Sequence, residues 1–188
     1  MKITKIETIP VEIPINPQRA IRSGRGYHVT SPFLLLRVHT DEDIIGLGEV
    51  SCTAVWSGED HVSSARMIRE YLEPALVGED PTQIERLTRV MAKTIANNPF
   101  TKSAIEMALW DILGKVAGLP VYRLLGGAVR DFVTTKFSVS GLEPAKAAEL
   151  AAWAVEQGFR AMKVKVGIQP EEDVARVRAV RAAIGPDV

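Results

Sequence analysis

Two lysines separated by one residue, Lys163 and Lys165, are the side chains of this sequence best suited to proton transfer. They lie in the segment Ala161–Gly167, in which alternation predicts a strand with both lysines on one face and apolar residues on the other. Two ammonium groups about 7 Å apart along a strand repel each other. Burial also disfavours the charged form, so a lysine here can become the neutral amine that accepts a proton.

An exposed strand with two solvated lysines is the alternative interpretation of the same pattern.

Other residue types offer weaker candidates for a functional site. The three histidines fall on separate predicted elements, and no Cys/His cluster has the spacing of a zinc site. Glu106 and Asp111 are polar positions on an otherwise apolar predicted helix, where such side chains usually face water or cap a neighbouring element. No dinucleotide-binding or phosphate-binding loop is present.

The elements around the lysines alternate between strand and helix. Strands are predicted at 133–139 and 159–166, and helices at 143–157 and 169–184. This β-α-β-α order is typical of parallel strands joined by crossover helices. The predicted apolar stripe of the last helix consists of Val174, Val177, Val180 and Ile184.

The first fifty residues predict strands, at 1–14, 33–40 and 44–50, and the last two strands are expected to form a hairpin. Residues 16–30 are expected to form a long polar loop. Glycines at positions 46 and 48 predict a bulge or a close approach of another backbone to the third strand.

Helical spacing of apolar residues then follows. It predicts a helix over 57–76 and a second one opened by Asp80 as N-cap and Pro81 as first residue. A third helix is expected to begin at Thr101 or Ser103 and to end before Gly118.

Composition excludes several classes of function. The 188 residues include 23 Lys and Arg and 23 Asp and Glu, so the basic surplus of a nucleic-acid or polybasic membrane binder is missing. Apolar runs such as 33–36 are far shorter than the roughly 20 residues of a membrane span. Cys52 is the single cysteine and cannot form an internal disulfide, which is consistent with a reducing compartment. We therefore expect a cytoplasmic globular protein.

Two adjoining segments carry a family resemblance. Residues 103–115 (SAIEMALWDILGK) and 117–127 (AGLPVYRLLGG) resemble the signature of the mandelate racemase/muconate lactonizing enzyme family, part of the enolase superfamily. Residues 163–165 resemble its KxK motif at the end of the second barrel strand. The resemblance covers essentially the whole chain and implies two parts. These are an α+β capping domain at 1–128, with an antiparallel three-stranded meander and a helical bundle, and the first two βα units of a TIM-like (β/α) barrel at 129–188.

The resemblance also implies a reaction. Family members bind Mg²⁺ and remove the proton next to a carboxylate, which gives an enolate held by the metal. Carried over, Lys165 is the base or acid and Lys163 supports it electrostatically. The KxK motif together with residues 100–103 (FTKS) looks closest to the muconate lactonizing subgroup. An isomerase or lyase, namely a racemase, epimerase or cycloisomerase, is the leading expectation. An acid-sugar dehydratase of the same superfamily and a non-catalytic capping or binding module remain the alternatives.

The family's substrate contacts come from two capping-domain loops, here 16–28 and 50–58, and its metal ligands come from the third to fifth barrel strands. The Mg²⁺ ligands are therefore expected downstream of this chain, in an enzyme about twice as long, and the chain alone is expected to be inactive. The expected partner is a small-molecule carboxylate, with neither nucleic acid nor membrane, and the full-length enzyme is expected to be a homo-oligomer. The residues expected to bind the substrate are Arg22, Arg25, Tyr27, Val55, Trp56 and Ser138.

Overall fold

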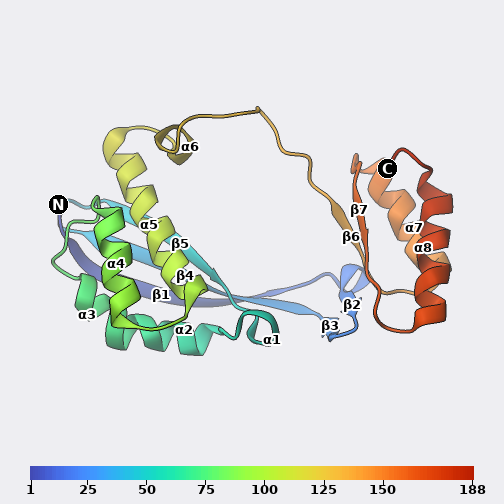
Figure 1. Cartoon of the computed structure of the whole chain (residues 1–188), viewed down its shortest axis with the longest axis horizontal. Helices are drawn as coiled ribbons and strands as arrows, with labels where there is room; N and C mark the ends of the chain where they lie inside the picture. Colours follow the sequence, from blue (N-terminus) through green and yellow to red (C-terminus); the bar gives the residue numbers. More distant parts are fainter. The chain divides into compact units, whose positions relative to one another are not determined.

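The computed structural model describes residues 1–188, and the chain forms two compact units (Figure 1). The first unit consists of Met1–Ile13 and Ser31–Val129, and the second of Pro14–Thr30 and Arg130–Val188. The segment 14–30 thus packs with the last third of the chain, although its neighbours in sequence belong to the first unit.

A three-stranded sheet in the order β1-β4-β5 forms one layer of the first unit. Its strands are β1 (Ile3–Pro14), β4 (Thr30–Thr40) and β5 (Ile45–Ser51). Strands β4 and β5 are antiparallel, so the predicted hairpin is confirmed. Alternation along β4 buries every second side chain of its central part. These buried residues are Leu34, Leu36 and Val38.

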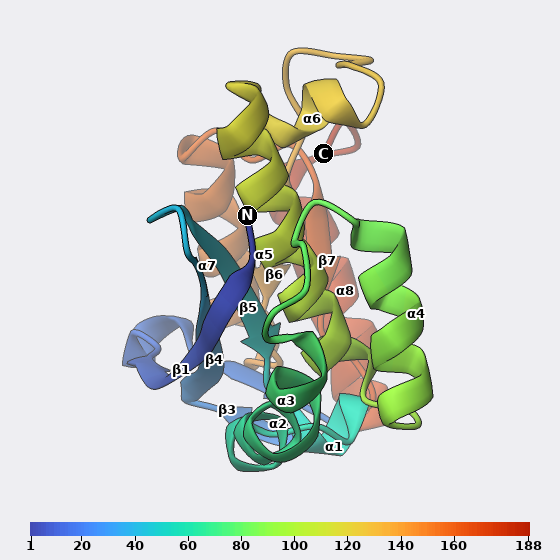
Figure 2. The same cartoon turned by 90° about the vertical axis from the view of Figure 1, so that its left-hand side faces the viewer.

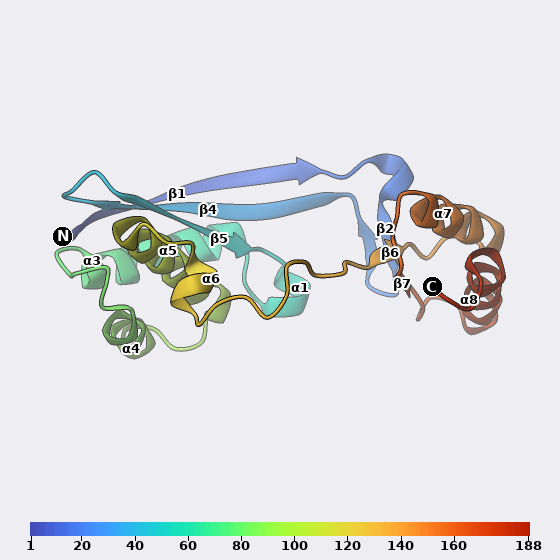
Figure 3. The ribbon, with the colours of Figure 1, turned by 90° about the horizontal axis from the view of Figure 1, so that it is seen from above.

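Helices form the second layer of the first unit. Figure 3 shows α4 and α5 on the same side of the sheet, and Figure 2 shows α2 and α3 end on, with α3 in front of α2. The expected three-stranded sheet with helices is confirmed. The helices are α1 (Ala54–Ser57), α2 (His61–Met67), the π-helical turn η2 (Ile68–Leu72), α3 (Glu73–Leu76), α4 (Ile84–Thr94), α5 (Pro99–Ala117) and α6 (Val121–Leu124).

Helix α5 packs directly against the backbone of β5. A Cβ atom added to Gly46 would lie 2.1 Å from the carbonyl oxygen of Ala108, and one added to Gly48 would lie 2.0 Å from that of Ala104. No real Cβ atom tolerates such distances, so only glycine permits this packing. The predicted close approach at these two glycines is confirmed.

Two polar side chains of α5 bind main-chain groups of β5. The Leu47 amide donates to the Asp111 carboxylate at 2.8 Å, and Lys115 Nζ donates to the Ile45 carbonyl at 2.6 Å. Lys115 also lies 2.7 Å from Asp111. Asp111 therefore caps a neighbouring strand, which was one of the two roles expected for it.

A buried carboxylate holds the beginning of α5. Glu59 accepts hydrogen bonds from the Phe100 and Thr101 amides, both at 2.9 Å, and from the Thr101 hydroxyl at 2.6 Å. These amides belong to the first turn of a helix, where no intrahelical partner exists. The helix begins at Pro99, so the expected start at Thr101 or Ser103 is wrong by at least two residues.

The predicted start of α4 is also wrong. The Asp80 carboxylate accepts hydrogen bonds from the Thr82 amide at 2.9 Å and from the Thr82 hydroxyl at 2.7 Å. Such a contact closes a turn rather than opening a helix. The helix begins at Ile84, three residues after Pro81, its predicted first residue.

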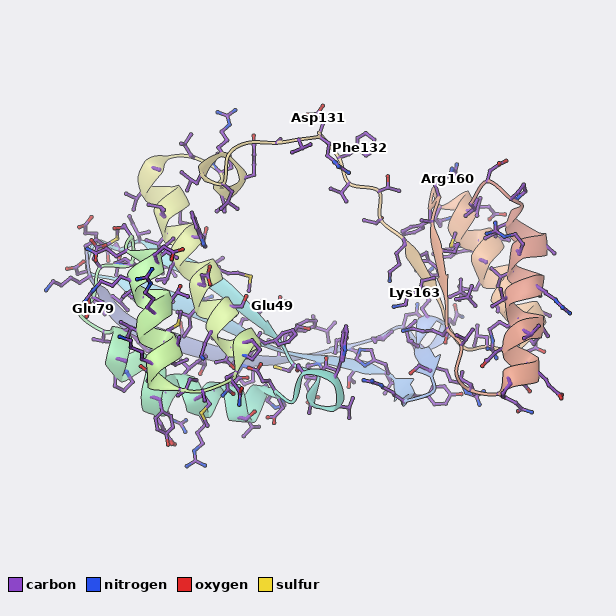
Figure 4. All side chains as sticks on the ribbon, in the orientation of Figure 1. Glu49, Glu79, Asp131, Phe132, Arg160 and Lys163 are labelled. Carbon is purple, nitrogen blue, oxygen red and sulfur yellow. The ribbon has the colours of Figure 1, made fainter.

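The second unit contains the expected β-α-β-α order. Its elements are β6 (Phe137–Val139), α7 (Pro144–Glu156), β7 (Met162–Val164) and α8 (Pro170–Ile184). The two strands are parallel and shorter than predicted. Figure 4 shows Asp131 and Phe132 on the extended segment that precedes β6. The part of this segment at 133–136 was expected to belong to the strand, which begins only at Phe137.

Residues 16–30 form more structure than a polar loop. The segment contains the short 3₁₀-helix η1 (Pro17–Arg19) and a two-stranded antiparallel hairpin of β2 (Ile21–Ser23) and β3 (Gly26–His28). Gly26 has a φ of +108°, which favours glycine, at the point where the chain enters β3. The sequence did not predict these strands, because three residues are too few to show a clear alternation of apolar and polar side chains.

The buried face of α8 differs from the predicted stripe. Val174 and Val177 are exposed, whereas Asp173 and Arg176 are buried together with Val180. The two charged residues pair with each other, which removes much of the cost of burying either one. Val180 and Ile184 do pack in the core of this unit, so hydrophobic spacing predicted the second half of the buried face of α8 and missed the first half.

Candidate active site

The two lysines lie on the same face of the β6–β7 pair. The strand register places Ser138 directly beside Lys163, which is labelled in Figure 4. Lys165 follows the last residue of β7, and its amide continues the ladder by donating to the Val139 carbonyl at 3.0 Å. Alternation then puts Lys165 on the face of Lys163 and Ser138, while Val139 and Val164 pack against the helices on the other face.

The environment of Lys165 favours the neutral amine. Burial is the main cause that lowers the pKa of Lys165, and the positive charges of Lys163 and Lys136 lower it further. Lys165 is half-buried, whereas Lys163 is exposed. A lysine with a lowered pKa can accept a proton at a pH where an ordinary lysine remains charged.

Lys136 is a nearby functional group that was missed in the sequence. Its Nζ donates to the Ser138 hydroxyl at 2.6 Å, and it is the second positive charge that affects Lys165. The signal that could have identified it is its position two residues before Ser138, the spacing that repeats along one face of a strand. The same face therefore presents three ammonium groups.

The hairpin of residues 16–30 is fixed to the chain that follows β6. The Ser140 hydroxyl donates to the Ala20 carbonyl at 2.9 Å and accepts from the Arg22 amide at 2.8 Å. The Gly141 amide donates to the Arg22 carbonyl at 3.0 Å. Strand β2 is thus held by its main chain at the carboxyl end of β6.

The same segment also contacts the chain that follows β7. A Cβ atom added to Gly24 would lie 2.4 Å from the Gly167 carbonyl oxygen, so two backbones meet there. At the other end of the segment, the Arg19 guanidinium lies 3.9 Å from the centre of the Trp153 ring on α7. Residues 20–24 therefore lie at the carboxyl ends of both parallel strands, the same end at which Lys165 projects. Arg19 instead lies beside Trp153, which packs against Phe137 at the beginning of β6.

Three of the predicted substrate-binding residues belong to this hairpin. Arg22 and Tyr27 are opposite each other in the β2–β3 register, and the guanidinium carbon of Arg22 lies 5.8 Å from the centre of the Tyr27 ring. Tyr27 is exposed, and Arg25 lies in the turn, where its amide donates to the Ser23 hydroxyl at 3.2 Å. The structure thus brings Arg22 and Tyr27 together within the unit that carries the lysines.

The other two predicted loop residues lie in the first unit. Val55 and Trp56 are on α1, and each is 79% exposed. Helix α1 is a single turn that ends at Gly58, whose φ is +78°. Their role in substrate binding stays a prediction.

No group of three or more His, Cys, Asp or Glu residues that could hold a metal ion occurs in residues 1–188. The residues present therefore do not fit a magnesium site by themselves. None of the helices combines the length and the apolar character needed to cross a lipid bilayer.

Comparison with known families gives two matches. A family profile described as "Mandelate racemase / muconate lactonizing enzyme, N-terminal domain" matches residues 5–126. A second profile, described as "Enolase C-terminal domain-like", matches residues 146–188.

Three individual proteins illustrate the similarity. The N-succinyl-L-Arg/Lys racemase of Bacillus cereus is 35% identical over 188 residues, which are 100% of this chain and 50% of the racemase. Its crystal structure superposes with a TM-score of 0.95 at 34% identity, with the same coverage. A dipeptide epimerase from Enterococcus faecalis, crystallised with Mg and the dipeptide L-Leu-L-Tyr, gives a TM-score of 0.93 at 32% identity, covering 100% of this chain and 52% of the epimerase.

The third protein has a different activity. The D-galactonate dehydratase of Verminephrobacter eiseniae is 37% identical over 176 residues, which are 86% of this chain and 44% of the dehydratase. The chain spans about half the length of these relatives.

Proposed function

Because this chain belongs to the mandelate racemase/muconate lactonizing enzyme family, we propose that it is part of an enzyme that removes the proton α to a substrate carboxylate, with Lys165 as the base. The leading activity is that of a racemase, epimerase or cycloisomerase. The observation that carries the proposal is the position of Lys165, half-buried beside Lys163 at the carboxyl end of β7, with a lowered pKa.

The lysines of this chain perform the proton transfer. The lone pair of the neutral Lys165 amine takes the α proton, and the electrons of the C–H bond move toward the carboxylate to form an enolate. Lys165 then carries the proton as an ammonium group and can return it. Lys163 acts on this step without touching the proton, because its positive charge keeps Lys165 neutral before the reaction and attracts the enolate after it.

The ligands of the metal are expected outside this chain. We propose that Mg²⁺, which is present in the dipeptide epimerase structure, is bound in the whole protein by residues outside 1–188. The division into a capping domain at 1–128 and the first two βα units of a barrel at 129–188 belongs to the same proposal. A homo-oligomeric, cytoplasmic enzyme is also part of it.

The substrate is proposed to be a small carboxylate. A guanidinium group binds a carboxylate through two parallel hydrogen bonds, which suits Arg22 or Arg25 to a second carboxylate remote from the reacting carbon. Tyr27, Val55 and Trp56 are exposed side chains that can contact the rest of the molecule. Ser138 shares the face of Lys163 and already binds Lys136.

A dehydratase of an acid sugar is the second candidate. Its support is the 37% identity to D-galactonate dehydratase over 86% of this chain, beside 35% over the whole chain for the racemase. Both reactions begin with removal of an α proton, so the role proposed for Lys165 is the same. They differ in the next step, in which a dehydratase expels a hydroxyl group as water. A non-catalytic binding module assigns no chemical role to Lys165, which is half-buried near Lys163.

The test is α-proton exchange in D₂O, followed by NMR, using the longest natural protein that contains this chain. N-succinyl amino acids, dipeptides and D-galactonate serve as substrates. The Lys165→Ala variant should lose exchange by more than about 10³-fold, because the base acts in the transition state. The Lys163→Ala variant should lose less, since Lys163 only tunes Lys165.

The order of the two variants decides the outcome. An inactive Lys163→Ala variant together with an active Lys165→Ala variant would show that the assignment of the base is wrong. Loss of water from D-galactonate, without exchange of the amino-acid substrates, would select the dehydratase.

A further inference from the structure

We propose that Arg176 and Asp173 on α8 are positioning residues that fix the backbone from which Lys165 projects. The inference rests on the proposed function, in which Lys165 is the base. It assigns a role to two buried charged side chains that do not face the substrate. The role follows from their contacts with the main chain on both sides of Lys165.

Arg176 joins three segments of the second unit. Its side chain is 1% exposed. Its Nη1 donates to the Lys165 carbonyl at 3.2 Å and also to the Asp173 carboxylate, and its Nε donates to the Leu142 carbonyl in the loop after β6. One guanidinium therefore ties the ends of both parallel strands to the first half of α8.

Asp173 holds the turn that follows Lys165. Its Oδ2 accepts hydrogen bonds from the Gly167 amide at 2.7 Å and from the Ile168 amide at 3.0 Å. Burial would raise the pKa of Asp173, but the hydrogen bonds from Arg176 and from the two amides outweigh it, so the net pKa is lowered. Asp173 is thus an anion whose two oxygens bind the turn and Arg176.

The main chain of Lys165 is consequently held on both sides. Its amide donates to the Val139 carbonyl at 3.0 Å, and its carbonyl accepts from Arg176. Asp173 binds the amide of Gly167, which is two residues after Lys165. A side chain whose backbone is fixed in this way has fewer directions available to its amine, which is what a proton acceptor requires.

Stability alone does not account for the pair. Burying two charges is expensive, and replacing a buried ion pair by apolar residues is often neutral or stabilising. Valines suited to such a replacement are available on α8 at Val174 and Val177, yet both are exposed. The helix instead turns Asp173 and Arg176 inward, where they bind the backbone around Lys165.

The experiment compares Arg176→Lys and Arg176→Met with the wild type, in the longest natural protein that contains this chain. The matched control is Glu172→Gln. Glu172 is on the same helix, 3.8 Å from Arg176 and 49% exposed, and no hydrogen bond joins it to the turn after β7. Two quantities are measured, the steady-state kinetics of α-proton exchange and the pKa of Lys165. The pKa is read from the pH dependence of acetylation of Lys165 by acetic anhydride, detected by mass spectrometry.

Both Arg176 variants should lower kcat by about 10- to 100-fold, with a change in KM of less than about threefold, because the base is displaced rather than the substrate. The pKa of Lys165 should rise toward its ordinary value as the amine moves away from Lys163 and Lys136 into water. Arg176→Lys should not restore activity, since one ammonium group cannot span two carbonyls and a carboxylate. Glu172→Gln should match the wild type.

Other outcomes are equally informative. Arg176 variants with a lower melting temperature but wild-type kcat and wild-type Lys165 pKa would show a purely structural pair and overturn the inference. If no substrate undergoes exchange even with the wild type, while the Arg176 variants still raise the pKa of Lys165, the proposed function fails and the positioning role stands. If the Arg176 variants do not fold, Asp173→Asn replaces them. This substitution preserves the shape of the side chain. It should lower kcat and raise the pKa of Lys165, each by less than the Arg176 variants do, and an unchanged kcat and Lys165 pKa would overturn the inference.

Discussion

At the scale of single residues, the charge of Lys165 should control the pH dependence of the reaction. Only the neutral amine accepts a proton, and burial, Lys163 and Lys136 all lower the pKa of Lys165. The kcat/KM for α-proton exchange should therefore rise as the pH increases through this lowered pKa and level off above it. Removing a neighbouring positive charge should raise the pKa, so the rising part of the profile should move to higher pH in Lys163→Met and, by a smaller amount, in Lys136→Met.

The control for this prediction is Lys146→Met, which removes an exposed lysine of α7 that does not affect the pKa of Lys165. Profiles would be recorded in the longest natural protein at constant ionic strength, because salt screens charges. A profile that moves to lower pH in Lys163→Met, or by equal amounts in all three variants, would contradict the electrostatic explanation.

At the scale of elements, the contact between α5 and β5 should not tolerate a methyl group. Gly48→Ala would place a Cβ atom 2.0 Å from a carbonyl oxygen of α5, so the helix or the strand must move. Overpacking of this kind costs about 1–3 kcal/mol. We expect a loss of about that size in the free energy of unfolding, measured with urea.

Leu47→Ala is the matched control, because Leu47 is the neighbouring residue of β5 and its side chain is 57% exposed. It should cost less than about 1 kcal/mol. Equal losses for the two variants would mean that the direct contact between the two backbones is not what limits position 48.

Local sequence patterns predicted the elements whose signal lies in regular spacing. Alternation placed Lys163 and Lys165 on one face, and the glycines of β5 indicated the close approach of α5. Predictions from patterns failed where a side chain binds the main chain, because such contacts leave no regular spacing in the sequence. Asp80 closes a turn rather than opening a helix, and the Asp173–Arg176 pair occupies the place predicted for two valines on the inner face of α8. Ser140 was missed because its partners, Ala20 and Arg22, are brought to it only by tertiary structure.

At the scale of the whole molecule, residues 1–188 produced alone should show no Mg²⁺-stimulated α-proton exchange. No group in this chain could hold the metal, and β7 has a neighbouring strand on one side only. An unpaired strand edge also favours association with other chains. The measurement is exchange in D₂O with and without Mg²⁺, beside the longer protein at equal concentration, together with sedimentation velocity. Stimulated exchange by the isolated chain would contradict the first expectation, and a clean monomer at micromolar concentration the second.

The discontinuity of the second unit affects the order of events on the ribosome. The Arg22 amide and its partner Ser140 are 118 positions apart. At a synthesis rate of roughly 5–20 residues per second, the hairpin waits on the order of ten seconds for the strand end that receives it. During that interval the nascent hairpin has neither Ser140 nor Gly167 to hold it. A slowed ribosome between codons 30 and 140 would lengthen the exposure of this hairpin to chaperones and proteases.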